Sequence, residues 1–369
     1  MADTGASAPI WIDSNAGLAQ AAANFGAVIA VDTEFIRTDT FFPIPGLYQV
    51  GTDDAVYLID PLAIDDWLPL QAAIEDPNCV KVMHSCSEDL EVFHSHLGLA
   101  PQSLFDSQLA HAFLTTDFSM SYARLVAHYC DVELDKGETR SNWLQRPLTD
   151  RQVHYAAEDV RYLVGIYHTQ RRALEACGRL DWFFEDLAVQ CRYQPPYPER
   201  YYLNMKAAWR LDTRALARLR DLCRWREQEA MARNLPRNRV IRDENLLALA
   251  EAQVLSREVL FELLPQGVAR RFGDAVRAAW AGESPVEEPL EAPPQPLSQG
   301  QGKLVNALRD IGKGQAAQLG VAPELLARKR DVELALRSHL AGAGLARFEQ
   351  GWRSDLLRES FNSLLAQRS

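Results

Sequence analysis

Hydrophobic and polar positions divide this chain into a first part that alternates short strands with helices and a later part that is helical. Residues 28–36 form a β-branched apolar run that two acids interrupt. Residues 47–51 and 56–60 continue as strands, and clusters of proline and glycine separate the three segments. This order predicts a three-stranded meander near the start of the chain.

The pattern changes after residue 66. We expect a helix near residues 66–75, a strand over residues 79–84, a helix from about residue 87 and further helices to about residue 176. Alternating strands and helices usually build one sheet with helices packed on its faces. The sequence therefore predicts an α/β domain with a mixed sheet flanked by helices.

Two proline-rich segments interrupt the later, helical part. Residues 192–200 contain three prolines and residues 283–302 contain five, so neither segment can continue a helix or pack a core. Between them, the spacing of apolar residues predicts a helix over residues 211–231 and a second helix that begins near Asp243. The prolines therefore mark candidate domain boundaries.

Length and composition indicate a globular protein with several domains. The chain has 369 residues, 47% of them apolar, which exceeds what one core usually serves, so we expect two or three domains. No run approaches the roughly 18 apolar residues of a membrane span, and the N-terminal segment lacks the regions of a signal peptide, which predicts a cytoplasmic protein with no membrane partner. The six cysteines show no zinc-site spacing, so we expect reduced, mostly buried thiols without a disulfide framework.

Charge is distributed unevenly along the chain. Residues 1–170 hold 8 Lys and Arg against 24 Asp and Glu, residues 171–283 hold 20 against 16, and residues 284–369 hold 11 against 10. Within the middle segment the basic residues concentrate between Arg200 and Arg242. This asymmetry suggests an acidic, metal-binding half joined to a half that can approach phosphates, and an ordinary solvated helix surface is the alternative for the basic residues.

Asp32 and Glu34 interrupt the first apolar strand. Side chains at positions i and i+2 of a strand share one face, so both carboxylates project the same way. Acids inside a buried strand are costly unless a charge neutralises them, which a divalent cation does directly. The pair is therefore a candidate for metal binding, and the alternative is two ordinary polar residues at an exposed strand end.

A third acid is expected just after the strand over residues 79–84. The candidates are Glu88, Asp89 and Glu91, and Ser85 with Glu88 fits a capping box that would begin a helix there. An acid in the first turn of such a helix would face the edge of the sheet. The sequence alone leaves all three acids open.

The last candidate element is a helix whose start a Thr149/Gln152 capping box predicts. Tyr155 and Asp159 are four residues apart, so at about 100° per residue they lie on nearly the same face. His154 lies about 140° away from Asp159 on a regular helix. Helix geometry therefore favours Tyr155 over His154 as the residue that acts beside Asp159.

Taken together, these segments resemble the tyrosine-type branch of the DEDD 3′→5′ exonuclease superfamily, and in particular the ribonuclease D family. The motifs that carry the resemblance are Asp32-x-Glu34, residues 87–93 and residues 155–163, with residues 134–148 matching a stretch that precedes the family's third motif. Residues 209–280 resemble the HRDC (helicase and RNase D C-terminal) domain, and residues 303–369 fit a second, more divergent copy. The resemblance covers nearly the whole chain.

The resemblance implies an RNase H-like α/β exonuclease domain followed by two all-α HRDC-type domains. The expected division is an exonuclease domain over residues 8–190, a linker over 191–206, a first HRDC domain over 207–283, a proline-rich linker over 284–302 and a second HRDC-like domain over 303–369.

The resemblance also implies the chemistry. Asp32, Glu34, Asp89 and Asp159 would hold two Mg²⁺ or Mn²⁺ ions, hard cations that oxygen ligands suit, and Tyr155 would orient the attacking water. Attack at the terminal linkage would release 5′-mononucleotides from the 3′ end of RNA. The implied substrate is precursor tRNA with a free 3′ end, and we expect the protein to be monomeric.

Substrate contacts are expected from both parts of the chain. The resemblance makes Lys136 a candidate phosphate ligand, and Phe35 either stacks against the terminal base or packs in the core. Glu158 departs from the family pattern, in which a small residue is common, and would either compete for metal or point away from the site. In the helical part the candidate residues for tracking RNA are Arg233, Arg237, Arg239 and Arg242.

Two other functions are compatible with these motifs. A DNA-directed 3′→5′ exonuclease of the same fold is the first, because nothing in the motifs contacts a 2′-hydroxyl group. A non-catalytic RNA-binding scaffold is the second, and the presence of all five active-site residues argues against it.

Overall fold

The computed structural model describes residues 7–134, 137–138, 141–282 and 290–367. The chain forms two compact units, of which the first contains Met1–Ile36, Ile44–Tyr193 and Leu297–Ser369 and the second contains Arg37–Pro43 and Gln194–Pro296. The C-terminal segment thus belongs to the same unit as the N-terminal one. Across the described ranges, no helix is both long and apolar enough to cross a membrane.

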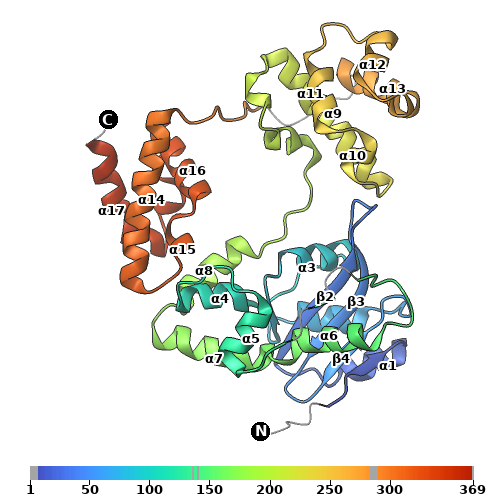
Figure 1. Cartoon of the computed structure of the whole chain (residues 1–369), viewed down its shortest axis with the longest axis vertical. Helices are drawn as coiled ribbons and strands as arrows, with labels where there is room; N and C mark the ends of the chain where they lie inside the picture. Colours follow the sequence, from blue (N-terminus) through green and yellow to red (C-terminus); the bar gives the residue numbers. More distant parts are fainter. Residues whose placement is uncertain (1–6, 135–136, 139–140, 283–289, 368–369) are drawn as a thin grey trace. The chain divides into compact units, whose positions relative to one another are not determined.

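A six-stranded mixed sheet forms the centre of the first unit (Figure 1). Its spatial order is β1-β4-β3-β2-β5-β6, with antiparallel pairing within β2, β3 and β4 and parallel pairing for β1 with β4, β2 with β5 and β5 with β6. The predicted meander and mixed sheet are confirmed. The strands are β1 Ile10–Ile12, β2 Val28–Ile36, β3 Ile44–Gly51, β4 Val56–Ile59, β5 Val80–Met83 and β6 Leu104–Asp106.

Strand β3 begins three residues earlier than the sequence suggested. Pro45 and Gly46 were expected in a turn, which is wrong, because Pro45 pairs with Phe35 and a register shift separates that pair from Glu34. A Cβ atom at Gly46 would lie 2.6 Å from the Cβ atom of Trp143, so only glycine permits this approach. The short strands β1 and β6 were not predicted, since three residues carry little periodicity.

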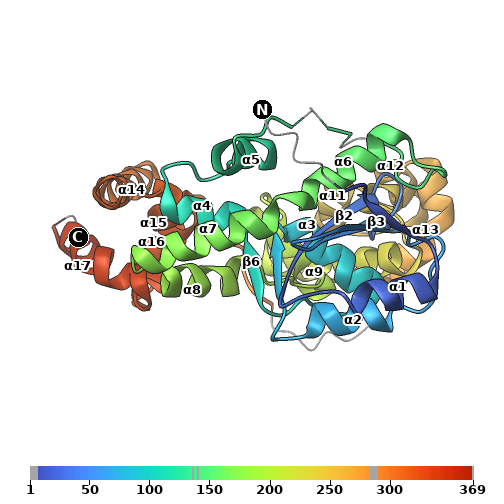
Figure 2. The ribbon, with the colours of Figure 1, turned by 90° about the horizontal axis from the view of Figure 1, so that it is seen from below.

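Helices cover both faces of the sheet (Figure 2). On one face Ala30 of β2 packs in a core with Ala156 and Val160 of α6, while on the other face Ile29 and Val31 pack with residues of α1, α2 and α3. Alternation along β2 therefore sends neighbouring side chains into two different cores. The helices are α1 Asn15–Ala22, α2 Leu68–Glu75, α3 Ser87–Val92, α4 Ser107–Leu114, α5 Tyr122–Cys130, α6 Asp150–Arg161, α7 Leu163–Ala176 and α8 Leu180–Gln190, with a π-helical turn over Phe93–Leu97 after α3.

The second unit is helical. Its elements are the short 3₁₀ segments Pro198–Asn204 and Ala208–Arg210, followed by α9 Thr213–Ala232, α10 Arg237–Val240, α11 Asp243–Glu251, α12 Arg257–Leu263 and α13 Gln266–Ala281. Residues 37–43, which connect β2 to β3, belong to this unit: Phe41 lies in its core, and the Asn234 side chain accepts the backbone N–H groups of Phe41 and Phe42 at 3.0 and 2.9 Å.

A second helical module closes the chain and belongs to the first unit. It consists of α14 Gln299–Leu319, α15 Pro323–Ala327, α16 Lys329–Leu340, the 3₁₀ segment Ala346–Phe348 and α17 Trp352–Ala366. Its order of a long helix, a very short one and longer ones matches that of α9, α10, α11 and α13. The Trp352 ring stacks on Trp182 of α8 with centroids 4.9 Å apart, so the module shares an aromatic core with the α/β part of the first unit.

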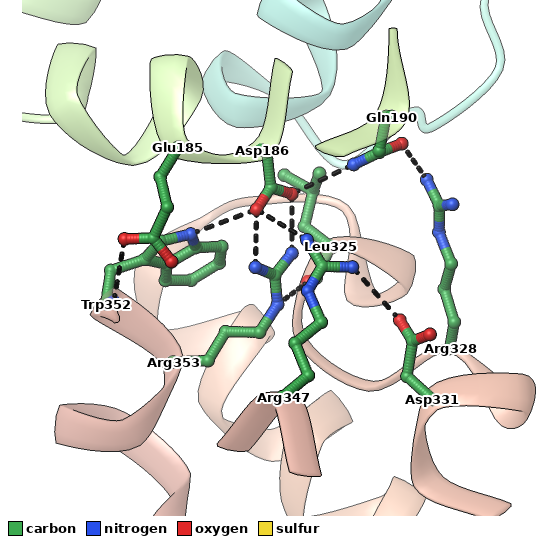
Figure 3. A network of polar contacts seen from close by, with 9 residues as sticks. All are labelled: Glu185, Asp186, Gln190, Leu325, Arg328, Asp331, Arg347, Trp352 and Arg353. Atoms are coloured by element: carbon green, nitrogen blue, oxygen red, sulfur yellow. Dashed lines mark hydrogen bonds and ion pairs between the residues drawn. The ribbon is translucent and has the colours of Figure 1, made fainter. Parts of the chain in front are cut away.

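A buried carboxylate holds this module to α8 (Figure 3). Asp186, which is fully buried, accepts hydrogen bonds from both terminal nitrogens of Arg353 at 2.5 and 2.6 Å and from Arg347 at 2.7 Å. The indole N–H of Trp352 donates to the same carboxylate at 3.2 Å. The guanidinium of Arg347 also forms an ion pair with Asp331 at 3.2 Å. These donors all come from the C-terminal module, so Asp186 is the centre of a network that Glu185 and Gln190 of α8 extend through contacts with Trp352 and Arg328.

We expect Asp186→Ala to lower the free energy of unfolding by about 3 to 5 kcal/mol, because two guanidinium groups would lose the charge that pairs them in a buried site. Denaturant unfolding of the full chain measures this loss. The matched control is Asp310→Ala on α14, whose exposed ion pair with Lys313 should change stability by under about 1 kcal/mol. Equal effects of the two substitutions would contradict the role given to Asp186.

Candidate active site

Three carboxylates meet between β2 and α6. Asp32 and Glu34 project from the same face of β2, as their spacing predicted, and Asp159 comes from the facing helix α6. One oxygen of each carboxylate lies within 4.8 Å of the others. The structure therefore brings together acids that are more than 120 residues apart in the sequence.

Asp89 supplies a fourth carboxylate from the first turn of α3. It is buried, accepts a hydrogen bond from the Thr33 hydroxyl at 2.5 Å and adds to the negative field at Asp32. Of its two rivals, Glu88 is exposed and Glu91 is half-buried. Only the orientation of α3 against β2, which the sequence pattern does not contain, selects Asp89.

The capping box expected at the start of α3 is wrong. The helix begins at Ser87 with Cys86 as its N-cap residue, and no side chain caps it. Ser85 instead adopts a left-handed conformation with φ of 59°. By contrast, the Thr149/Gln152 capping box of α6 is present with both of its reciprocal hydrogen bonds, and that prediction is confirmed.

Burial and mutual repulsion raise the pKa of all four carboxyl groups. Burial is the largest cause for each: the pKa of Glu34 rises to about 9, the pKa values of Asp89 and Asp159 rise to about 7, and the pKa of Asp32 rises well above its ordinary value. Neighbouring carboxylates add to the increase at Asp32 and Glu34. A cluster of this kind is suited to cations, since bound positive charge would offset both the cost of burying the carboxylates and their repulsion.

Tyr155 lies one helical turn before Asp159 on α6, close enough to act on its carboxyl group, whose pKa it lowers against the larger effect of burial. Burial and the nearby acids raise the pKa of the Tyr155 hydroxyl, which keeps it a proton donor. His154 is exposed and lines the same cavity of about 540 Å³ as Tyr155 and Asp159. Of the two candidates, Tyr155 is the one that contacts Asp159, as the helix-face argument predicted.

Glu158 lines the same cavity but is not among the three acids whose oxygens cluster within 4.8 Å. Its carboxylate pairs with Arg161 at 2.7 Å, and its backbone carbonyl accepts the Tyr122 hydroxyl at 2.7 Å.

The structure places the predicted substrate contacts in different settings. Lys136 lies outside the described residues. Phe35 is half-buried and packs against the core on the α1, α2 and α3 side of the sheet. Each of the four candidate arginines pairs with an acid: Arg233 with Glu229, Arg237 with Glu227, Arg239 with Asp39 and Arg242 with Glu244.

Sequence reasoning missed three polar residues around the site. Thr33 holds Asp89, and Tyr122 holds the α6 backbone at Glu158. The third is Gln49, which is fully buried on β3 directly opposite Asp32 and has no hydrogen-bond partner for either amide atom among the described residues. A buried amide without partners is uncommon. The available signal was a glutamine inside an otherwise apolar strand.

Comparison with known proteins gives the class of this chain. A family model described as 3′-5′ exonuclease matches residues 9–175, and a model of the HRDC domain matches residues 215–279. The fold and the acid cluster are thus those of a 3′-5′ exonuclease that carries an HRDC domain. Use of divalent metal, which the exonuclease family implies, agrees with the clustered oxygens of Asp32, Glu34 and Asp159 and with Asp89 beside them.

Relatives over nearly the full length give the particular family. The chain is 43% identical to ribonuclease D of Pseudomonas paraeruginosa over 338 residues, which cover 89% of each protein. It is 37% identical to ribonuclease D of Escherichia coli over 365 residues, which cover 96% of this chain and 97% of that one. This chain belongs to the ribonuclease D family.

A solved structure supports the same assignment. The crystal structure of Escherichia coli RNase D, described as an exoribonuclease involved in structured RNA processing, matches with a TM-score of 0.87 at 35% identity and covers 97% of this chain and 99% of that one. The predicted fold class and the predicted 3′-5′ exoribonuclease activity are therefore confirmed.

We expect Gln49→Leu to leave the free energy of unfolding unchanged or to raise it by about 1 to 3 kcal/mol, because leucine fills similar space and needs no hydrogen bonds. Exonuclease activity should fall, since Gln49 is the cross-strand neighbour of Asp32. The control is Gln71→Leu, which removes a hydrogen bond to the Leu97 carbonyl and should destabilise the chain by about 1 kcal/mol. A Gln49→Leu chain with lower stability and normal activity would refute this view of Gln49.

Proposed function

We propose that this chain removes 5′-mononucleotides from the 3′ end of RNA with two Mg²⁺ or Mn²⁺ ions, and that precursor tRNA is its substrate. The observation that supports the metal assignment most directly is the meeting of Asp32, Glu34 and Asp159 within 4.8 Å, with Asp89 beside them. Four carboxylates supply charge that matches two divalent cations. Their oxygen atoms suit hard ions of this kind.

The residues of the chain have distinct roles in this proposal. Asp32, Glu34, Asp89 and Asp159 would hold the ions, which would lower the pKa of a water molecule and offset the negative charge that develops on the scissile phosphate. Tyr155 would orient the attacking water from its position beside Asp159 on α6. Thr33 holds Asp89 in place through a hydrogen bond from its hydroxyl group.

RNA outside the active site is proposed to contact the helical second unit through Arg239 and Arg242. Their side chains are 70% and 69% exposed, and their ion pairs with exposed acids are long, at 3.3 and 3.5 Å. Such pairs contribute little and exchange readily for phosphate. Arg237 has a different role, since its guanidinium lies over the Phe41 ring and pairs with the buried Glu227 at 2.7 Å.

We also propose that the chain acts as a monomer in the cytoplasm, where precursor tRNA is made. DNA is the competing substrate, because no residue of the acid cluster distinguishes a 2′-hydroxyl group by itself. Digestion of matched RNA and DNA oligonucleotides, next to a 3′-extended tRNA, separates the two. Faster release of mononucleotides from DNA would overturn the assignment to RNA.

We expect an excess of chelator to abolish release of mononucleotides and added Mg²⁺ to restore it. Asp32→Asn should lower kcat by about 10²-fold or more, because it keeps the shape of the side chain and removes its charge. Asp54→Asn, at an exposed position in the loop between β3 and β4, is the matched control and should retain normal activity. Full turnover in excess chelator would exclude the metal mechanism.

We expect Tyr155→Phe to lower kcat by about 10²-fold with little change in KM, because the substitution removes only the hydroxyl group that orients water. His154→Ala should be close to normal, since that side chain is exposed and the contact with Asp159 belongs to Tyr155. Single-turnover assays on a 3′-extended tRNA measure both variants. An inactive His154→Ala together with a normal Tyr155→Phe would reverse the assignment.

A further inference from the structure

Two cysteines and an aspartate from separate segments of the sequence converge in the first unit, and they share no residue with the acid cluster between β2 and α6. Cys86 is the N-cap residue of α3, Asp106 ends β6, and Cys191 follows α8. Their two sulfur atoms and one carboxylate oxygen all lie within 4.8 Å of one another. Cys86 and Asp106 are buried, and Cys191 is half-buried.

Hydrogen bonds fix Cys86 and Asp106 in place. The Cys86 backbone N–H donates to one Asp106 oxygen at 3.0 Å, and the other oxygen accepts the backbone N–H groups of Gln108 and Leu109, which caps α4. The nearby Cys191 thiol, burial and the charge of Asp106 all raise the pKa of the Cys86 thiol. The thiols thus face an excess of negative charge that a cation would offset.

A cavity of about 150 Å³ adjoins the group. Its walls include all three side chains together with Gln190 and Arg328. The Arg328 guanidinium donates to the Gln190 amide oxygen at 2.5 Å and lies 4.5 Å from the centre of the Phe118 ring, so its position is fixed. The negative charges of two thiolates and one carboxylate would equal the positive charges of one divalent cation and this guanidinium.

We propose that Cys86, Asp106 and Cys191 bind a thiophilic divalent cation of the zinc class, with the adjoining cavity supplying a fourth position for water. Three protein ligands plus water make a complete tetrahedral set, and thiolate donors select zinc-like ions over Mg²⁺ and Mn²⁺. Binding releases one proton from each thiol to the solvent. The oxygen-only cluster between β2 and α6 has the opposite preference, so the two sites take different metals.

The place of this site in the fold suggests what the bound ion does. It would join the start of α3, the end of β6 and the end of α8. No disulfide bond connects these three elements. Asp89 lies three residues after Cys86, so the ion would also fix the helix that carries this acid. We therefore assign it a stabilising function, and the proposal does not depend on the roles given to the catalytic residues.

Titration of the reduced, metal-free full chain with Co²⁺ tests the proposal. Binding by thiolates produces an intense sulfur-to-cobalt charge-transfer absorption, which carboxylate ligands do not give. We expect this band to saturate at one equivalent, to disappear when Zn²⁺ is added and to be lost in Cys86→Ser and Cys191→Ser. Cys177→Ser, at an exposed cysteine, is the control and should keep the band.

Asp106→Asn provides a variant in which folding is preserved, because asparagine also caps helices while its amide is a poor metal ligand. It should bind Co²⁺ at least 10-fold more weakly than the native chain. Circular dichroism confirms that each variant is folded. The proposal would be overturned if the reduced native chain gave no band, or if the band persisted in a Cys86→Ser/Cys191→Ser double variant. It would also be overturned if Cys86 and Cys191 formed a disulfide bond and the chain bound no Co²⁺ through its thiols.

Discussion

Burial of like charge between β2 and α6 is the constraint on which the active site depends. Asp32, Glu34 and Asp159 are held close enough for their repulsion and burial to raise their pKa values, and Asp89 adds to the same field. Isolated carboxylates would not stay in such a position without support from a rigid scaffold and bound cations. A strand between two hydrogen-bonded neighbours and a helix with a complete capping box provide the rigidity. The same feature that costs stability thus creates the affinity for metal.

The sequence predicted those parts of the site that local periodicity decides. Spacing by two on a strand placed Asp32 and Glu34 on one face, and spacing by four on a helix placed Tyr155 beside Asp159. Asp89 could not be separated from its two acidic neighbours in the same way, because the choice depends on how α3 packs against β2. The expected capping box is absent for a related reason. Ser85 has a left-handed backbone conformation, and no side chain caps the first turn of α3.

Interactions between distant segments escaped prediction entirely. The partner of Arg239 shows why, since Asp39, with which it forms an ion pair, lies 200 residues earlier in the chain. The convergence of Cys86 and Cys191 and the position of Gln49 opposite Asp32 are also products of the sheet topology. Rules based on the spacing of residues along the sequence cannot predict contacts of this kind.

Helix α8 shows how a long excursion of the chain can be accommodated. After α8 the chain leaves the first unit for roughly 100 residues and returns at Leu297. Closing a connection of that length costs only about 5 kcal/mol in chain entropy. Burial of the Trp352 side chain against Trp182 offsets part of that cost, and the ion pairs of Asp186 fix the geometry of the interface. These contacts hold the module to α8 within the first unit, so the second unit is free to carry the contacts with RNA that we propose for Arg239 and Arg242.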